Sequence, residues 1–291
     1  MSLNQNLQLQ GTLYIVSTPI GNLRDITFRA IDTLKDVSLI ACEDTRITHK
    51  LMQHYQIKTP MTSYNDHNAP KKRPKLLERM RKGETIALVS DAGTPLISDP
   101  GFKLVQKCME EGIRIIPIPG ASAILSGLVA SGIPTDKFMF IGFLPTKKSR
   151  IIEIVNKFEY LETTLILFET AKRLKKTLKI LSENLGSREI TIARELTKHY
   201  EEINRMALAD AVTKYETSAT LKGEIVIIIG PPSGVNLLTQ CDIDNILKSA
   251  LKSLSIKDAT NKIAPITNRS RRVLYERAIE LLASMDENTL A

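Results

Sequence analysis

Between residues 11 and 118 short apolar runs alternate with segments of helical period. The runs are TLYIV (12–16), SLIAC (38–42), TIALV (85–89) and IRIIPI (113–118). In the segments between them apolar residues recur every three or four positions, which is typical of amphipathic helices. Strands that are apolar on both faces need helices on both faces. The pattern therefore predicts a parallel sheet in an α/β domain over residues 11–118.

A different pattern follows residue 118. GASAILSGLVASG (120–132) predicts a helix of small residues that packs closely on its neighbours. RLKKTLKILSENLG predicts a longer helix that ends at Gly186, because glycine is the usual residue after a helix C-terminus. The segments KFMFIGF, TTLILFET, EITIARELT and GEIVIIIG predict strands. We therefore expect a second, mixed α/β domain over residues 119–232.

The C-terminal part reads as helical. GPPSGVNLLTQ (230–240) has the composition of a linker, and it precedes three helical stretches at 242–252, 256–264 and 268–284. Pro265 predicts a break between the last two. The Arg-rich last helix suggests a small helix-turn-helix-like domain over residues 241–291.

Composition excludes several classes of protein. Apolar residues make up 43% of the 291 and charged residues 25%, as in ordinary globular proteins. The first ten residues lack the pattern of a secretory signal, and no apolar run approaches the length of a membrane helix. Three distant cysteines fit a reducing compartment. The histidines lack metal-ligand spacing, since His49 and His54 fall on different helix faces. We expect a cytoplasmic protein with no metal and no membrane partner.

Positive charge is concentrated in a few segments. The net charge is +8, and KKRPKLLERMRK (71–82) holds seven basic residues against one acid. NRSRRVLYER (268–277) and PTKKSR (145–150) are also basic. Any single run is more often a solvated helix face. Together they favour contact with nucleic acid.

Polar and small residues gather where the predicted strands end. The clusters are STPIGNLRDIT (17–27), EDTRIT (43–48), SDAGTPLISDPG (90–101) and PGASA (119–123). One such cluster could serve only as a helix cap, as Asp25, Asp44 and Ser98 could individually. Four clusters at one edge of a parallel sheet predict a binding crevice beyond the strand ends.

The residues in this crevice limit its ligand. Neither a Gly-x-Gly-x-x-Gly fingerprint nor a Walker A motif is present, which disfavours dinucleotides and triphosphates. The carboxylates of Asp91 and Asp99 favour a ligand with positive charge. Hydroxyl groups that can bond a ligand follow at Ser17, Thr94, Ser98 and Ser122. An adenosyl sulfonium compound satisfies these requirements.

The same motifs resemble a known family. TLYIVSTPIGNLRDIT, ACEDTR, ALVSDAGTPLISDPG and PIPGASA are similar to motifs of the tetrapyrrole methylase superfamily of S-adenosyl-L-methionine-dependent enzymes. FMFIGFLP, LFETAKRL, ARELTKHYEE and KGEIVIIIG resemble one branch, which 2′-O-methylates a cytidine in the decoding region of 16S rRNA. The resemblance covers roughly residues 11–232, and NRSRRVLYERAI is similar to the same branch. It implies two α/β domains with the methyl donor in the cleft between them, a homodimer, and 16S rRNA or the small ribosomal subunit as partner.

The resemblance also implies site residues. The donor would be bound by Pro19, Ser90, Asp91, Ala92, Gly93, Thr94, Pro95, Ile97, Gly120, Ala121, Ser122, Phe168 and Glu169. RNA would be contacted by Asn22, Arg24, Arg46, Asn65, Arg173 and Arg194. Each arginine could equally form a surface ion pair, and each asparagine could bond only its own turn.

A ribose 2′-hydroxyl is a weak nucleophile at neutral pH, so we expect a general base. The candidates are Glu43, Asp44 and Glu195. Asp44 is more readily explained as the cap of a helix, and Glu195 could pair with Arg194. Three alternatives remain open: a methylase acting on a tetrapyrrole or other small molecule, an enzyme that modifies a protein side chain, and a non-catalytic RNA-binding module. Donor binding would separate the last from the enzymes.

Overall fold

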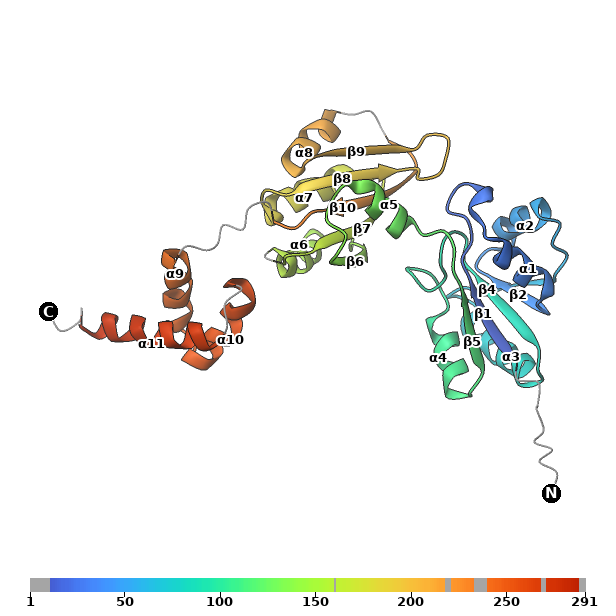
Figure 1. Cartoon of the computed structure of the whole chain (residues 1–291), viewed down its shortest axis with the longest axis horizontal. Coiled ribbons are helices and arrows are strands. Elements are labelled where there is room, and N and C mark those ends of the chain that lie inside the picture. The colour runs from blue at the N-terminus through green and yellow to red at the C-terminus, as the bar shows by residue number, and fades with distance from the viewer. Residues whose placement is uncertain (1–10, 160, 218–220, 233–239, 268–270, 288–291) are drawn as a thin grey trace, which may run out of the picture.

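The computed structural model describes residues 11–159, 161–217, 221–232, 240–267 and 271–287. Two sheet-containing units and a unit of three helices follow one another along the long axis of the molecule (Figure 1). Within the described residues no helix is both long enough and apolar enough to cross a lipid bilayer.

The first unit contains a five-stranded sheet of order β3-β2-β4-β1-β5, in which every neighbouring pair is parallel. Its strands are β1 (Thr12–Val16), β2 (Leu39–Cys42), β3 (Met61–Ser63), β4 (Thr85–Val89) and β5 (Arg114–Ile118). The parallel sheet predicted from the apolar runs is confirmed. The edge strand β3 was not predicted, because its three half-buried residues form no apolar run.

Helices cover both faces of this sheet. They are α1 (Phe28–Asp36), α2 (Thr45–His54), α3 (Ala69–Arg81) and α4 (Phe102–Glu110), with a 3₁₀ turn at Leu23–Asp25. The apolar sides of α1 and α2 pack with Val16 and Ile40 into one core, and those of α3 and α4 pack with Leu13 and Leu88 into another. Two cores on opposite faces explain why the strands are apolar throughout.

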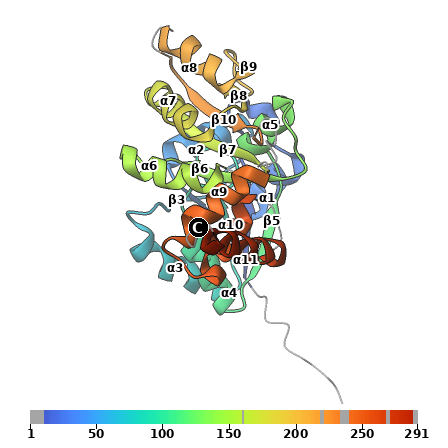
Figure 2. The ribbon, with the colours of Figure 1, turned by 90° about the vertical axis from the view of Figure 1, so that its left-hand side faces the viewer.

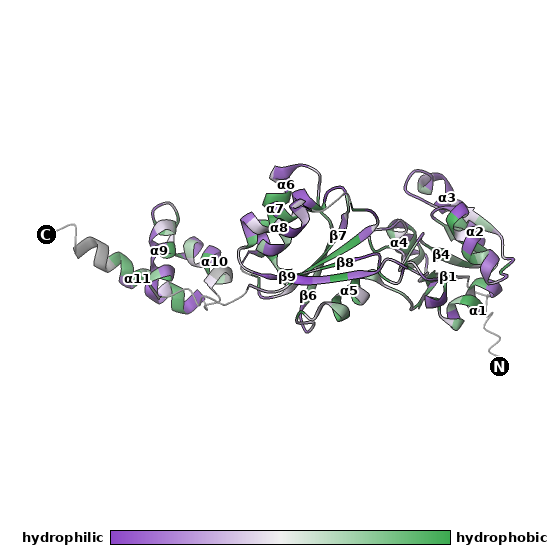
Figure 3. Cartoon of the chain, turned by 90° about the horizontal axis from the view of Figure 1, so that it is seen from above, coloured by the Kyte–Doolittle hydropathy of each residue, from purple (hydrophilic) through white to green (hydrophobic). Residues whose placement is uncertain are grey.

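The second unit has a mixed sheet of order β6-β7-β10-β8-β9. Its strands are β6 (Phe138–Phe143), β7 (Thr164–Thr170), β8 (Glu189–Arg194), β9 (Glu202–Ala207) and β10 (Glu224–Ile229). β6 and β7 run parallel, whereas the other described pairs are antiparallel. The edge strand β9 is largely hydrophilic (Figure 3), as edge strands commonly are.

Helices also enclose this second sheet. α6 (Lys148–Val155), α7 (Leu174–Leu185) and α8 (Leu208–Thr217) cover one face, and α5 (Ala123–Ser131) covers the other (Figure 2). A short 3₁₀ turn, Asn156–Phe158, follows α6. α5 lies close to β10, since a Cβ on Gly127 would be 3.2 Å from the side chains of Val226 and Ile228. This close approach confirms the packing predicted for the small-residue helix, and α7 ends at Gly186 as predicted.

The third unit consists of α9 (Gln240–Leu251), α10 (Ile256–Thr267) and α11 (Arg271–Glu287), which share a core of their own. Arg277 of α11 pairs with Asp244 of α9 at 2.5 Å. The predicted break at Pro265 is wrong, because α10 continues through it to Thr267. The two α/β units and the helical unit confirm the predicted fold class.

Candidate active site

The clusters that follow the strands of the first sheet lie beside one another. Thr18 and Gly93 exchange two backbone hydrogen bonds, of 2.8 and 3.0 Å, just beyond the ends of β1 and β4. The Ser17 and Thr94 hydroxyls are 2.9 Å apart. A Cβ on Gly120 would lie 2.9 Å from the Cβ of Ser17, so the chain after β5 also approaches β1 closely. The carboxyl edge of the sheet thus gathers the polar segments, as the rule for parallel sheets predicts.

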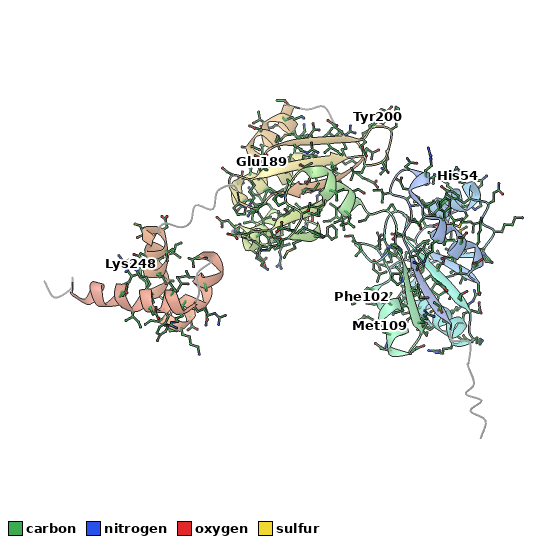
Figure 4. All side chains as sticks on the ribbon, in the orientation of Figure 1. His54, Phe102, Met109, Glu189, Tyr200 and Lys248 are labelled. Atoms are coloured by element: carbon green, nitrogen blue, oxygen red, sulfur yellow. The ribbon has the colours of Figure 1, made fainter. Side chains whose placement is uncertain are left out.

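These segments form one wall of a cavity of about 820 Å³. The opposite wall comes from the second unit, through Phe143, the end of β7, Leu196 and the start of β10. Figure 4 shows the orientation of that unit: Tyr200 marks the β8–β9 loop at the end nearer the first sheet, and Glu189 marks the far end. Both units are therefore needed to enclose the cavity.

The backbone beside the cavity adopts unusual conformations. Gly93 has a φ of 76°, and the non-glycine residues Leu96 and Ser98 have φ values of 74° and 66°. Positive φ in a branched residue such as Leu costs free energy and persists only where the surroundings enforce it. The loop between β4 and α4 is thus held in a strained shape where it lines the cavity.

Most residues that the resemblance assigned to the donor line this cavity. They are Asp91, Ala92, Gly93, Thr94, Ile97, Gly120, Ser122, Phe168 and Glu169. Pro19, Ser90, Pro95 and Ala121 are outside the lining but adjoin it in sequence. The carboxylate of Glu169 is buried and already bound: it accepts hydrogen bonds from the Thr177 hydroxyl (2.5 Å) and the Thr170 amide (2.7 Å). It also pairs with Arg173 at 3.3 Å.

Besides Glu169 and Glu224 of the second unit, three carboxylates of the first unit line the cavity: Glu43, Asp91 and Asp99. Burial raises the pKa of each above its ordinary value. The charges of Asp91 and Asp99 raise the pKa of Glu43 further, and that of Asp91 raises the pKa of Asp99. A positively charged ligand would relieve this repulsion. The cavity therefore favours a cationic group at its acidic wall.

Asp44 and Glu195 lie outside the cavity lining, and their carboxylates have other partners. Asp44 caps α2 by accepting from the amide of Arg46 at 2.8 Å, and its pairing with the Arg46 guanidinium lowers its pKa to about 2. Glu195 accepts from Lys198 (2.8 Å) and from the amide of Glu224 (3.0 Å), and the Lys198 bond lowers its pKa. The cap interpretation of Asp44 is confirmed, whereas the predicted pairing of Glu195 with Arg194 is replaced by the Lys198 pair. Only Glu43, of the three candidate bases, faces the cavity.

The residues predicted to contact RNA also lie outside the lining. Asn22 caps the 3₁₀ turn through the amide of Arg24, and Asn65 donates to the backbone carbonyl of Glu43 at 3.4 Å. Arg46 and Arg194 pair with Asp44 and Glu202. Arg173 donates to the carbonyls of Leu144 and Pro145 at 2.6 and 3.1 Å. Within the described residues the Arg24 guanidinium has no protein partner.

Several lining residues were missed by the sequence reasoning. Phe143, Leu196 and the stretch 223–226 come from the second unit and reach the cavity only through tertiary packing. The sequence FIGF places an aromatic residue directly after a glycine at a strand end, and this pattern could have indicated that Phe143 faces the cavity. Among the described residues no group of three or more His, Cys, Asp or Glu side chains is arranged to hold a metal ion.

The chain is similar to known proteins along most of its length. Residues 12–212 match the model of Tetrapyrrole (Corrin/Porphyrin) Methylases, and residues 240–282 match that of the RsmI C-terminal HTH domain. It is 42% identical to ribosomal RNA small subunit methyltransferase I of Mesorhizobium japonicum, over 94% of this chain and 93% of that protein. It is 46% identical to the protein of the same name from Synechocystis, over 94% and 99%.

A solved structure shares the fold. Uroporphyrin-III C-methyltransferase of Thermus thermophilus, complexed with S-adenosyl homocysteine, superposes with a TM-score of 0.53 at 17% identity, covering 76% of this chain and 97% of that one. The family resemblance predicted from the sequence motifs is confirmed by these matches.

Proposed function

This chain belongs to the tetrapyrrole methylase family, within it to the ribosomal RNA small subunit methyltransferase I group, and from that premise we propose that it methylates 16S rRNA. The acceptor would be the ribose 2′-hydroxyl of a cytidine in the decoding region. The methyl donor would be S-adenosyl-L-methionine. The acceptor would be a single-stranded or splayed-out nucleotide, since proteins read RNA sequence mainly where bases are unpaired. A ribosomal substrate in turn implies a cytoplasmic protein.

The observation that carries the proposal is the acidic wall of the cavity. Bound S-adenosyl-L-methionine supplies an activated methyl group on a positively charged sulfur. Glu43, Asp91 and Asp99 provide negative charge in a half-buried setting, where attraction for a cation is stronger than in water. A volume of about 820 Å³ is near the upper end of the roughly 300–1,000 Å³ of ligand pockets, so it can admit a donor and part of an acceptor.

The rest of the donor cradle fits a ligand that is mostly apolar and neutral. Ser17, Thr94 and Ser122 bring hydroxyl groups, and the turns at Gly93 and Gly120 bring backbone groups close to the cavity. Ile97, Phe168 and Val226 supply apolar surface for an adenine ring. Holding donor and acceptor in line can lower the barrier by up to about 7–11 kcal/mol, so most of the catalysis can be positioning.

Glu43 is the residue we assign as general base. Its raised pKa makes its carboxylate a better proton acceptor than an ordinary glutamate, and it faces the cavity. It would accept the proton of the 2′-hydroxyl as the oxygen attacks the methyl carbon. The side-chain amide of Asn65 donates to the backbone carbonyl of Glu43 and so helps to hold this residue in place. Asn65, which the resemblance assigned to RNA contact, would thus position the general base.

Phosphate contacts would come from exposed cations around the cavity. In the segment 71–82 the ion pairs of Arg79, Arg81 and Lys82 and the bonds of Lys72 and Arg73 to Thr62 and Tyr64 leave Lys71 and Lys75 as the better candidates. Arg24 is a further candidate. Such contacts make affinity fall with salt, because each phosphate contact releases counterions.

The family resemblance also implies a homodimer. Phe102 and Met109 of α4 are 62% and 69% exposed, and both are labelled in Figure 4. They form an apolar surface that a second copy would cover. Sedimentation equilibrium should give a dimer, and a monomer for Phe102→Glu combined with Met109→Glu.

The test of the function uses the purified chain, tritiated S-adenosyl-L-methionine and small ribosomal subunits from a strain that lacks this gene. Nuclease mapping should locate the label in a 2′-O-methylcytidine of the decoding region. Binding of S-adenosyl homocysteine without any RNA label would mean that the donor site is right and the acceptor wrong. Tetrapyrroles and proteins would then be assayed as acceptors.

A further inference from the structure

β6 contains a bulge that changes the direction of its last side chain. Phe140 pairs with Ile166 of β7 and Gly142 with Leu167, so Ile141 is an extra residue between them. Without the bulge Phe143 would point to the same face as Ile141, into the core under α6 and α7. With it, Phe143 pairs with Phe168 and faces the cavity instead. Gly142 permits the bulge, since its φ is 76°.

Phe143 belongs to a cluster of three phenylalanines. The ring of Phe168 makes edge-to-face contacts with Phe140 and Phe143, with centroids 4.8 and 5.5 Å apart. Phe140 and Phe168 are packed against the core, whereas Phe143 is 53% exposed in the cavity lining. One aromatic ring is therefore supported by two others and open towards the cavity. An aromatic ring exposed in the lining of a cavity is available to contact a ligand.

The chain that follows Phe143 is held against the start of α7. Arg173 donates to the carbonyls of Leu144 and Pro145, and Lys176 donates to that of Thr146 at 3.4 Å. Because Arg173 is itself bound to the buried Glu169, this segment has a firm anchor. Arg173 is thus a positioning residue for the Phe143 segment, in place of the phosphate contact first predicted for it.

Positive charge surrounds this anchored segment. Lys147 and Lys172 are exposed, and in the described part of the chain neither forms an ion pair with an acidic side chain. Lys176 lies near Lys147, because it donates to the carbonyl of the preceding residue, Thr146. In the cavity lining the first unit contributes Glu43, Asp91 and Asp99, and the second contributes Phe143 together with the carboxylates of Glu169 and Glu224. The lysines lie outside the lining, on the segments that flank Phe143, and there they would attract the phosphates of a bound RNA.

A nucleobase with its phosphates matches an aromatic ring beside lysines. Proteins that bind unpaired RNA stack its bases on aromatic side chains and hold its backbone with cations. The adenine of the methyl donor could also stack on a phenylalanine, but the donor carries no phosphate. The lysines therefore favour the acceptor.

We propose that Phe143 is the stacking platform for the base of the nucleotide that is methylated, with Lys147 and Lys172 on the neighbouring phosphates. This inference rests on the proposed function and names the residue that selects an unstacked base. A base drawn out of its RNA stack loses its stacking partners, and the ring of Phe143 would replace one of them. Stacking leaves the ribose free to meet Glu43.

The experiment compares Phe143→Ala and Phe143→Tyr with the original chain on subunits from the strain lacking this gene. Phe138→Ala is the matched control, because Phe138 is on the same strand and 43% exposed but outside the cavity lining. Loss of one base–aromatic stack should lower kcat/KM for the subunit about 10-fold or more in Phe143→Ala. Phe143→Tyr, which keeps the ring, and Phe138→Ala should stay within about 3-fold of the original.

Affinity for S-adenosyl homocysteine, measured by calorimetry on the same proteins, shows whether Phe143 stacks on the base of the RNA nucleotide or on the adenine of the methyl donor. Unchanged affinity in Phe143→Ala together with the loss of kcat/KM supports the proposal. Weakened affinity would mean that the ring holds the donor's adenine, and full activity of Phe143→Ala would mean that it holds neither; both overturn the proposal while leaving rRNA methylation intact. If the original chain labels no RNA, the proposed function fails, and this inference fails with it.

Discussion

At the scale of single residues, the neighbouring carboxylates Glu43 and Asp44 have opposite surroundings. Burial and the charges of Asp91 and Asp99 raise the pKa of Glu43. Hydrogen bonds from Arg46 lower the pKa of Asp44 to about 2. A carboxylate with a raised pKa accepts a proton more readily, whereas one stabilised by a guanidinium does so poorly. One of the pair is thus suited to chemistry and the other to capping α2.

Replacing each carboxylate by its amide tests this difference. Glu43→Gln should lower the single-turnover rate roughly 10²–10⁴-fold, the usual contribution of a general base. Asp44→Asn is the matched control, and because Asn is also a good N-cap its rate should stay within about 3-fold. A large loss in Asp44→Asn with full activity in Glu43→Gln would mean that Asp44, and not Glu43, is the general base.

The pH dependence follows from the same raised pKa. Glu43 accepts a proton only when it is ionised, so the single-turnover rate should fall as pH decreases through its raised pKa and level off above it. Asp99→Asn removes one of the charges that raise this pKa, so it should move the midpoint to lower pH. A midpoint that stays in place in this variant would argue against Glu43 as the titrating group.

At the scale of elements, the junction of β7, α7 and the segment after β6 depends on one ion pair. Glu169 is only 3% exposed and is bound by Arg173, Thr177 and the Thr170 amide. Arg173 connects this buried carboxylate to the carbonyls after Phe143. The pair therefore joins the second sheet to the mouth of the cavity.

Removing the arginine should destabilise the protein. Arg173→Ala leaves the buried Glu169 without its cation, and we expect the free energy of unfolding to fall by about 2–3 kcal/mol, less than for a fully buried pair because Arg173 is partly exposed. Arg150→Ala, which breaks the exposed pair with Glu153 on α6, should cost only about 0–1 kcal/mol. Urea denaturation of both variants measures the difference, and equal losses would contradict the anchoring role.

At the scale of the whole molecule, the three C-terminal helices form a separate core from Ile243, Leu247, Ile263, Leu274 and Leu281. Figure 1 shows this unit apart from the two sheets. Of the residues that the structure describes in this unit, none lines the cavity. We therefore propose residues 241–291 as a domain that takes part in binding the subunit and leaves the donor site to the rest of the chain.

Truncation after residue 232 separates these tasks. Affinity for S-adenosyl homocysteine should stay within about 2-fold, because the cavity residues all remain. The KM for the ribosomal subunit should rise and depend less steeply on salt, since the cations of α11 such as Arg271 are lost. An unchanged KM and salt dependence would show that the C-terminal domain does not contact the RNA.

The sequence by itself determined most elements of the fold and their order. Apolar runs of strand length between amphipathic segments predicted the parallel first sheet, and Gly186 marked the end of α7, because both patterns depend on neighbours in the chain. The clusters after the strands predicted where a ligand would bind, since parallel strands place their carboxyl ends at one edge. Four of the six residues of SDAGTP (90–95) and four of the five of PGASA (119–123) indeed line the cavity.

Only the tertiary structure decided which charged groups are free to act. Glu195 and Arg173 have backbone partners 29 residues away in sequence, and such pairs cannot be read from local spacing, whereas the Asp44 cap involves a residue two positions away and was predicted. The position of Phe143 depends on a one-residue bulge and its pairing with Phe168, and the short strand β3 depends on its neighbour β2. A side chain's burial and partners are set by elements packed against it from elsewhere in the chain. For this reason the location of the site was predictable, and the division of roles within it was not.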